Sequence, residues 1–355
     1  MNGGPERLMI HTGTPYPVLI GNGLLSDCGS LFSEISAPCR VMLVSDDTVA
    51  ALYGDRVERA LTAAGFSVSR FVFPHGEQSK TPETFVALVN AMAEAGLTRS
   101  DLAAALGGGV TGDLTGFAAS AYLRGIRYVQ LPTTVLAAVD SSVGGKTAVD
   151  LPAGKNLMGS FWQPSAVICD CDTFGTLPEP VFADGLAEAI KYGVLCDPEL
   201  FEQFEAFSRG QDMTQIAARC VRIKESYVVG DETDRGRRQY LNLGHTPAHA
   251  IEACSGYTIS HGRAVAIGMA MMARTSEKLG FAKEPFAERL SALLKKQGLP
   301  VNTSFSAEQL AAAAVSDKKR RGDRITLVMP RAIGDCDLYP VEIERLKDFF
   351  EAGLR

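Results

Sequence analysis

The chain has 355 residues, of which 46% are hydrophobic and 21% are charged, and its net charge is −6. This composition is ordinary for a globular protein, and the length is sufficient for two domains. The acidic balance excludes nucleic acid as the main partner, since no basic surplus exists to neutralise phosphates, although a local basic pocket can still hold a small anion. The eight cysteines are scattered, and we find neither a signal-peptide pattern nor a long apolar run. We therefore expect reduced thiols, a cytoplasmic location and no membrane partner.

The first half of the chain alternates short apolar runs with helical patterns. Buried strands are predicted at residues 40–45, 67–73, 102–106 and 128–131, and helices at 84–95 and 114–123. Strands that alternate with helices predict βαβ units, and hence a Rossmann-like, mostly parallel sheet.

After residue 178 the pattern changes to a period of about 3.6 residues, which indicates helices. The predicted helices cover residues 181–194, 199–207, 213–229, 248–253, 264–279 and 287–297, and one further strand is predicted at 325–329. We therefore predict an α/β domain at residues 1–177 and a mainly α-helical domain at residues 178–355.

A glycine-rich turn follows the strand predicted at 102–106 and precedes an apolar helix. Gly107, Gly109 and Gly112 satisfy the spacing GxGxxG. Glycines allow the backbone to approach a pyrophosphate closely, and the start of the helix offers free N–H groups. The alternative is a tight turn with a purely structural role.

Residues 131–160 are rich in threonine, serine and glycine, and two lysines in this segment follow glycines. Lys146 comes after Gly144 and Gly145, and Lys155 comes after Gly154. An ammonium group on such a turn can bind phosphate or carboxylate. The alternative is a pair of solvated lysines on a loop.

Three of the five histidines, His245, His249 and His261, lie within seventeen residues. Histidine is a common zinc ligand and a good proton-transfer group near neutral pH. The cluster therefore indicates a metal or catalytic site, whereas chance clustering of buried, hydrogen-bonded histidines is the alternative.

Taken together, these segments resemble the 3-dehydroquinate synthase family of sugar-phosphate cyclases. The matching strings are GGGVTGDLTGFAAS, RGIRYVQLPTTVLAAVDSSVGGKTAVD, GKNLMGSFWQP, GLAEAIKYG, LNLGHTPAHAIE and SHGRAVAIGM. The resemblance implies a homodimeric enzyme with an NAD-binding N-terminal domain and a helical domain that binds a divalent metal, Zn²⁺ or Co²⁺, and the substrate. It also implies conversion of 3-deoxy-D-arabino-heptulosonate 7-phosphate to 3-dehydroquinate and phosphate, in the shikimate pathway of aromatic amino-acid biosynthesis.

The resemblance assigns roles to individual residues. The implied metal ligands are Glu188, His245 and His261. The implied NAD contacts are Asp46, Glu77, Lys80, Gly108, Gly109, Asp113, Thr133, Thr134, Lys146, Lys155, Thr173 and Thr176. The implied catalytic and substrate-binding residues are Arg124 from the neighbouring subunit, Asp140, Lys146, Asn156, Lys191, Lys224, Asp234, Arg238, Asn242 and the phosphate-side His249, joined by Lys318 or Lys319. Pro247 suits the first turn of a helix with Thr246 as its N-cap, which would leave His245 just before the helix.

The chemistry implied by the resemblance involves no net redox change. NAD takes a hydride from the substrate, phosphate is eliminated, and the hydride returns before the ring opens and closes again. Arginine and lysine side chains would hold the carboxylate and the phosphate of the substrate.

The sequence departs from the family pattern at three places near the substrate residues. Asp234 and Arg263 each stand where the family usually has glutamate, and Pro247-Ala248 replaces a bulky apolar residue and glycine. These departures leave open a sister cyclase with another phosphorylated sugar. A metal- and NAD-dependent polyol dehydrogenase and a non-catalytic binding protein are the remaining alternatives.

Overall fold

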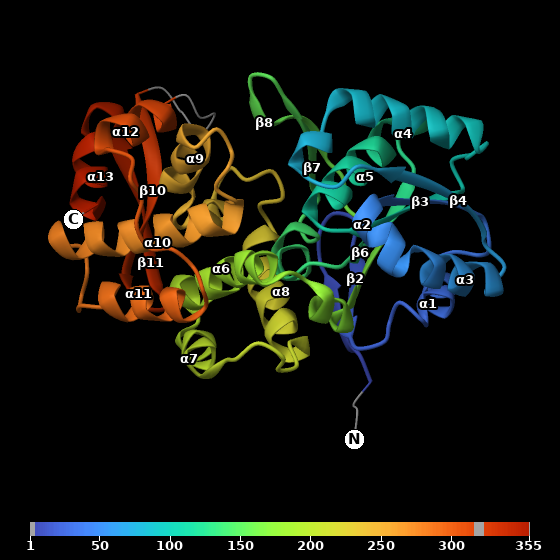
Figure 1. The fold of residues 1–355 in the computed structure, drawn as a ribbon, viewed down its shortest axis with the longest axis horizontal. Helices are drawn as coiled ribbons and strands as arrows, with labels where there is room; N and C mark the ends of the chain where they lie inside the picture. The colour runs from blue at the N-terminus through green and yellow to red at the C-terminus, as the bar shows by residue number, and fades with distance from the viewer. Residues whose placement is uncertain (1–3, 316–322, 355) are drawn as a thin grey trace. The chain divides into compact units, whose positions relative to one another are not determined.

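The computed structural model describes residues 4–315 and 323–354. The chain forms two compact units (Figure 1). The first consists of Met1–Leu177 and Asp212–Thr233, and the second of Pro178–Gln211 and Asp234–Arg355. Residues 212–233 were predicted with the helical second domain. They lie with the first unit because their helix, α8 (Thr214–Val228), packs against β1, β2 and η4 there.

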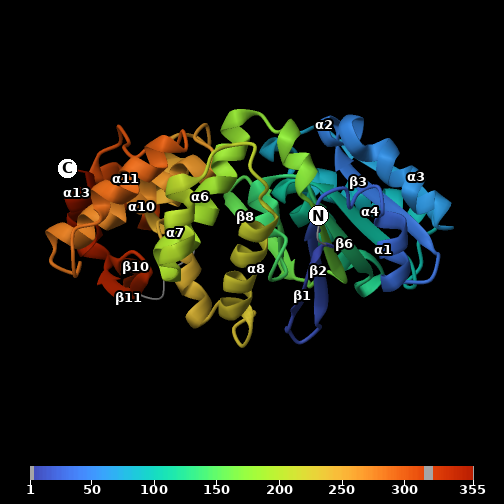
Figure 2. The same ribbon diagram turned by 90° about the horizontal axis from the view of Figure 1, so that it is seen from below.

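Within the described residues, the first unit contains a seven-stranded sheet (Figure 2). Its strands, in spatial order, are β1 (Glu6–Ile10), β2 (Tyr16–Gly21), β9 (Ala166–Asp170), β6 (Arg127–Pro132), β5 (Leu102–Gly107), β3 (Arg40–Asp46) and β4 (Ser67–Phe73). All neighbouring pairs are parallel except β1 and β2. The four strands predicted in this half are confirmed, as is the mostly parallel sheet, whereas β1, β2 and β9 were not predicted.

The order of the strands reverses between β3 and β5. From β3 the chain moves outward to β4, and it then returns to form β5 on the other side of β3. Ser45 is in register with Leu106, so Asp46 and Gly107 end these two strands side by side. In open α/β sheets, ligands bind at the carboxyl ends of strands at such a switch point.

Both faces of the sheet are buried, since successive side chains along a strand point alternately into two hydrophobic cores. Val41 and Leu43 of β3 pack with α1 (Cys28–Ile35) and α3 (Asp55–Ala63), whereas Met42 and Val44 pack with α4 (Pro82–Glu94) and α5 (Gly109–Ala121). A strand that is covered on both faces has a continuous apolar sequence rather than an alternating one. This is the pattern that made β3 and β5 recognisable.

Smaller elements complete the first unit. An antiparallel hairpin, β7 (Lys146–Leu151) with β8 (Gly154–Phe161), carries Lys146 and Lys155. The short helical segments are α2 (Asp47–Val49), η1 (Ala50–Gly54), η2 (Glu77–Ser79), η3 (Tyr122–Arg124), η4 (Ala137–Ser141) and η5 (Cys171–Thr176).

The second unit is mainly helical, as predicted. Its elements are α6 (Glu179–Cys196), α7 (Pro198–Ala206), η6 (Arg237–Asn242), α9 (His245–Cys254), α10 (His261–Lys278), α11 (Ala287–Lys296), α12 (Ala307–Val315), the hairpin β10 (Arg324–Ala332) with β11 (Asp335–Glu342), η7 (Ile343–Arg345) and α13 (Leu346–Leu354). Helix α10 is the centre of the unit, since α6, α9, α11, α13 and β10 all pack against it. No described helix has the length and apolar character needed to cross a membrane.

Candidate functional site

Three side chains from three separate helices converge in the second unit. Glu188 lies in the middle of α6 and is fully buried, while His245 and His261 are the first residues of α9 and α10. One donor atom from each lies within 4.8 Å of the other two. The Oε1 atom of Glu188 is 3.1 Å from Nε2 of His261 and 3.4 Å from Nε2 of His245. We call these three residues the histidine–glutamate cluster.

Close backbone packing at glycines brings the three helices together. A Cβ atom on Gly262 would lie 2.2 Å from the carbonyl oxygen of Asp184, one turn before Glu188 on α6. A Cβ atom on Gly268 would lie 2.1 Å from the carbonyl oxygen of Gly244, which directly precedes His245. The segments that carry Glu188, His245 and His261 are therefore held together by two backbone contacts that leave no room for a side chain at Gly262 or Gly268.

Helix α9 begins two residues earlier than predicted. His245 is its first residue, and the N-cap is Gly244, whose φ of 75° is in the left-handed region. The prediction that Thr246 caps the helix and that His245 precedes it is therefore wrong. Glycine takes up this backbone conformation without the steric cost that other residues incur.

The backbone orients the ring of His245. Its Nδ1 atom is 3.0 Å from the carbonyl oxygen of Leu243. A carbonyl oxygen only accepts hydrogen bonds, so Nδ1 carries the hydrogen of the neutral ring and Nε2 presents its lone pair towards Glu188.

Charge and burial make the histidine–glutamate cluster suitable for a divalent cation. Burial raises the pKa of Glu188, but the neighbouring cations, Lys191 foremost, outweigh it and hold that pKa well below its ordinary value. Burial lowers the pKa of His245 to about 4, whereas hydrogen bonds with Glu188 and Glu252 overcome burial and raise the pKa of His261 to about 10. One carboxylate and two imidazoles are donors that zinc and related divalent metals accept, and three protein ligands leave coordination positions open. The donor set therefore fits a catalytic divalent metal.

Other predicted site residues of the second unit surround this cluster or lie in nearby segments of the chain. Lys191 pairs with Glu188 at 2.6 Å and is itself buried. The ring of His249 lies 5.7 Å from that of His245 and 6.3 Å from that of His261. Arg238, which is buried, and Asn242 both belong to η6, and Asp234 has a left-handed φ of 59°. Lys318 and Lys319 lie outside the described residues.

In the first unit, the predicted glycine turn joins β5 to α5. Gly108 is the N-cap of α5 in an extended conformation, and Gly109 is its first helical residue. A Cβ atom on Gly107 would lie 2.4 Å from Oγ1 of Thr111, and one on Gly112 would lie 2.5 Å from Oε1 of Gln130 on β6. The strand, turn and helix that the GxGxxG spacing requires are present at the switch point of the sheet.

A buried lysine connects this turn to the β7–β8 hairpin. The Nζ atom of Lys80 donates hydrogen bonds of 2.6 Å to Oδ2 of Asp113 and of 2.6 Å to Oδ1 of Asn156. Lys80 is only 4% exposed, although its segment HGEQSK has the composition of a solvated turn. Burial raises the pKa of Asp113, and the charge of Lys80 offsets only part of that rise. Lys80, Asp113 and Asn156 form what we call the lysine–aspartate cluster.

A second ion pair in the first unit joins two more predicted residues. Lys224 of α8 pairs with the carboxylate of Asp140 in η4, and its Nζ atom also donates a 2.6 Å hydrogen bond to the carbonyl oxygen of Asp140. This contact is one of those that hold α8 against the first unit, although the sequence places it among helices of the second.

The remaining predicted residues of the first unit occupy varied positions. Oδ1 of Asp46 accepts a hydrogen bond from the backbone of Val49, and Glu77 lies 3.5 Å from Lys155. Oγ1 of Thr133, directly after β6, is buried without a hydrogen-bond partner among the described residues. Such an orphaned hydroxyl, beside the glycine turn, fits a polar ligand. Thr134 and Thr173 bond locally, Thr176 also bonds to Tyr53, and Arg124 and Lys146 are exposed.

The structure also brings in residues that sequence reasoning missed. The carboxylate of Glu252 lies beside His261, and that of Asp184 accepts a hydrogen bond from Ser260. Glu252 falls seven residues after His245, so its position two helical turns later could have suggested it, whereas Asp184 has no such signal.

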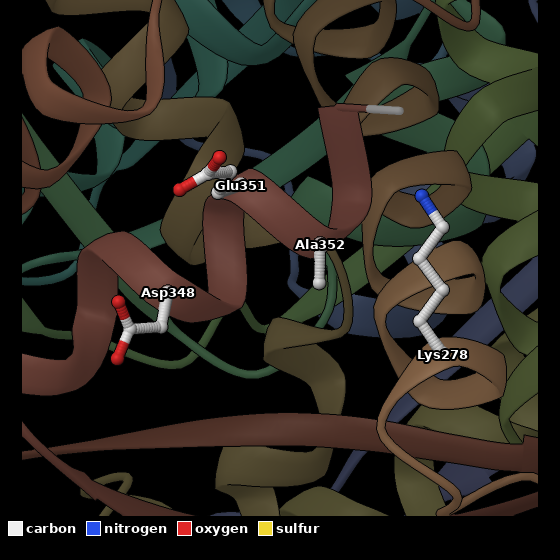
Figure 3. A pocket seen from close by; sticks show the side chains of 4 residues that line it. All are labelled: Lys278, Asp348, Glu351 and Ala352. Carbon is white, nitrogen blue, oxygen red and sulfur yellow. The ribbon is translucent and has the colours of Figure 1, made fainter.

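A surface hollow of about 410 Å³ lies elsewhere, against α10 and α13, and is lined by Lys278, Asp348, Glu351 and Ala352 (Figure 3). These residues are not among the predicted site residues, and Figure 3 shows their side chains spread apart rather than converging.

Comparisons with known proteins identify the family. The model of the 3-dehydroquinate synthase N-terminal domain matches residues 70–184, and that of the 3-dehydroquinate synthase C-terminal domain matches residues 185–320. The 3-dehydroquinate synthase of Clostridium acetobutylicum is 42% identical over 333 residues, which is 92% of this chain and 94% of the relative. That of Streptococcus sanguinis is 41% identical over 344 residues, which is 95% of this chain and 97% of the relative.

A solved structure shows the same architecture. The 2-epi-5-epi-valiolone synthase from Streptomyces hygroscopicus, with NAD⁺ and Zn²⁺ bound, has a TM-score of 0.87 and 27% identity, and the match covers 95% of this chain and 96% of that one. The predicted fold class is therefore confirmed. The chain is an enzyme of the 3-dehydroquinate synthase family.

Proposed function

We propose that the chain converts 3-deoxy-D-arabino-heptulosonate 7-phosphate to 3-dehydroquinate and phosphate, as a carbon–oxygen lyase that uses NAD and a divalent metal. Relatives that are 42% and 41% identical over almost their whole length carry the name 3-dehydroquinate synthase. The structural observation that supports the proposal most is the convergence of donor atoms from Glu188, His245 and His261.

Each cofactor has a region with suitable chemistry. We propose that the histidine–glutamate cluster holds Zn²⁺ or Co²⁺ and that the turn at Gly108, Gly109 and Asp113 receives NAD. A relative with 27% identity binds NAD⁺ and Zn²⁺. When bound, NAD supplies a reversible hydride acceptor, and the metal supplies a Lewis acid that lowers the pKa of a substrate hydroxyl.

The chain's own residues would bind the charged groups of the substrate. Arginine and lysine side chains bind carboxylate and phosphate through charge-assisted hydrogen bonds. We propose this role for Arg124, Lys146, Asn156, Lys191, Lys224, Arg238, Asn242 and His249. Asp140 would hold the ammonium of Lys224 in place, and Lys191 would keep Glu188 ionised. These assignments and the choice of cofactor residues rest on the family resemblance. The same resemblance supports NAD binding by residues 1–177, metal and substrate binding mainly by residues 178–355, a homodimer with Arg124 reaching the neighbouring subunit, and a cytoplasmic location.

A sister cyclase activity is the second candidate, because Asp234 and Arg263 depart from the family pattern. Sister enzymes would accept another phosphorylated sugar with the same cofactors. A polyol dehydrogenase would instead form NADH from an unphosphorylated polyol.

A substrate panel with two readouts separates these activities. The protein is incubated with NAD and Zn²⁺ and either heptulosonate phosphate, glucose 6-phosphate or glycerol, and phosphate and NADH are measured together. We expect phosphate from the heptulosonate without accumulation of NADH. Phosphate from glucose 6-phosphate alone would indicate a sister cyclase, and net NADH from glycerol would indicate a dehydrogenase. Either result, without turnover of the heptulosonate, would contradict the proposal.

A further inference from the structure

Glu252 is a buried carboxylate that touches the histidine–glutamate cluster without belonging to it. It lies on α9, two helical turns after His245, and only 3% of it is exposed. Its Oε2 atom is 3.4 Å from Nδ1 of His261. The other ring nitrogen of His261, Nε2, is 3.1 Å from Oε1 of Glu188. The ring of His261 is thus held between two carboxylates, one at each nitrogen.

We propose that Glu252 is a positioning residue that fixes the orientation and tautomer of His261 for metal binding. A metal takes the lone pair of one imidazole nitrogen, and the other nitrogen then carries the hydrogen. A carboxylate at Nδ1 accepts that hydrogen and leaves the lone pair on Nε2, which faces Glu188 and His245. The inference rests on the metal site of the proposed function.

The two histidines of the cluster are therefore oriented by different kinds of group. The backbone carbonyl of Leu243 holds Nδ1 of His245, and no side-chain substitution removes it. A side chain holds Nδ1 of His261, so this orientation can be removed by mutation. Partners of this kind in metal sites contribute about 10-fold to 100-fold to metal affinity.

A second arrangement of the same side chains must be distinguished from this one. Donor atoms of His249, Glu252 and His261 also lie within 4.8 Å of one another. In a metal site built from them, Glu252 would be a ligand and His261 would bind through Nδ1. The ring nitrogen of His261 that binds the metal therefore decides between the two arrangements.

The first test is nitrogen NMR of the imidazole rings in the intact zinc-loaded protein, with His261→Gln to assign the signals. We expect His261 to bind zinc through Nε2 and to keep a hydrogen on Nδ1. Binding through Nδ1 would overturn the proposal. This measurement needs no variant of Glu252 and so does not depend on whether such a variant folds.

The second test measures Zn²⁺ affinity by competition with a chromophoric chelator. Glu252→Ala should bind zinc about 10-fold to 100-fold more weakly, and Glu252→Gln, whose amide oxygen can still accept the hydrogen, should lose less. The matched control is Glu277→Gln on α10, because the carboxylate of Glu277 accepts hydrogen bonds from the backbone of Phe286 and Ala287 and, among the described residues, from no member of the histidine–glutamate cluster. The control should keep the affinity of the unmodified protein. Unchanged affinity in folded Glu252→Ala would overturn the proposal.

Failure of this inference can be told apart from failure of the proposed metal site. If Glu188→Ala loses zinc while Glu252→Ala retains it fully, the metal site stands and the role of Glu252 is refuted. If Glu188→Ala retains zinc, the metal site itself is refuted, and the inference fails with it.

Discussion

The histidine–glutamate cluster and the lysine–aspartate cluster are built in different ways. In the second unit, three helices that are distant in sequence are pressed together at glycines, and their side chains meet in the interior. In the first unit, the turn at Gly108 lies where the strand order reverses, and Lys80 connects that turn to a hairpin. The first cluster therefore depends on close helix packing, and the second on sheet topology. We expect substitutions to affect them independently.

Among the changes that test this difference, loss of Glu188 should have the largest effect on zinc binding and activity. Glu188→Ala removes one of three metal donors and leaves the buried Lys191 without its carboxylate. Zinc content, measured by elemental analysis, should fall from about one equivalent to none, and phosphate release should fall below detection. NAD affinity should be unchanged, because the lysine–aspartate cluster is intact. The exposed Glu202→Ala is the control, and a zinc-replete, active Glu188→Ala would contradict the assignment.

Loss of Lys80 should be the next largest effect. Lys80→Met leaves Asp113, whose side chain is 21% exposed, without its cation. Breaking a fully buried pair costs about 3–5 kcal/mol, and the partial exposure of Asp113 places the expected loss at the lower end of that range. Chemical denaturation should show this loss of stability, and NAD affinity should fall while zinc content is retained. The double variant Lys80→Met/Asp113→Asn should recover most of the stability, because the unpaired charge is gone. If stability stays low in the double variant, the ion pair is not its cause.

A smaller effect is expected when the helix packing is disturbed. Gly262→Ala places a methyl group against the backbone of Asp184 and should cost about 1–3 kcal/mol in the free energy of unfolding. Because α10 must move, zinc affinity should fall as well. Gly175→Ala is the matched control, since nothing lies within 4 Å of the added Cβ atom. Equal stability and zinc affinity in the two variants would show that the close contact does not position His261.

A change of one pH unit should give the smallest effect, and only on zinc affinity. In the metal-free protein the pKa of His261 is raised to about 10 and that of His245 is lowered to about 4, so near neutral pH only His261 must release a proton to bind zinc. Affinity should therefore rise about tenfold per pH unit between about pH 6 and 8, which is about 1.4 kcal/mol per unit. Calorimetry in buffers of different ionisation enthalpy should show about one proton released. Two protons, or none, would contradict the charge states of the cluster.

The elements that sequence analysis predicted are those with a strong local pattern. Strands β3 and β5 are covered on both faces and have continuous apolar sequences, and α6, α8 and α10 show clear helical periodicity. Strand β1 at the sheet edge and the β7–β8 hairpin escaped prediction because their burial is mixed. Strands β2 and β9 escaped prediction although most of their residues are buried, because each is short and pairs with strands that are distant in sequence. The position of α8 with the first unit also depends on long-range contacts.

The candidate site was predictable where family motifs cover it. The resemblance indicated Glu188, His245 and His261, and their donor atoms do lie together. The roles of Glu252 and of the Lys80–Asn156 hydrogen bond were not predicted, because each contact joins elements that the sequence does not relate. Nothing in the sequence indicated why residues 244, 262 and 268 are glycines. In the folded chain another backbone segment approaches each of them too closely for a side chain.

The most direct test of the account is the amount of phosphate formed per NAD when NAD is limiting. Protein stripped of NAD and metal is given heptulosonate phosphate, zinc and a small, known quantity of NAD, and phosphate and NADH are followed in the same sample. Because the proposed hydride returns in every cycle, we predict many phosphates per NAD, no accumulated NADH, and no phosphate without NAD or without metal. One phosphate per NAD with matching NADH, or full turnover without NAD, would contradict the account.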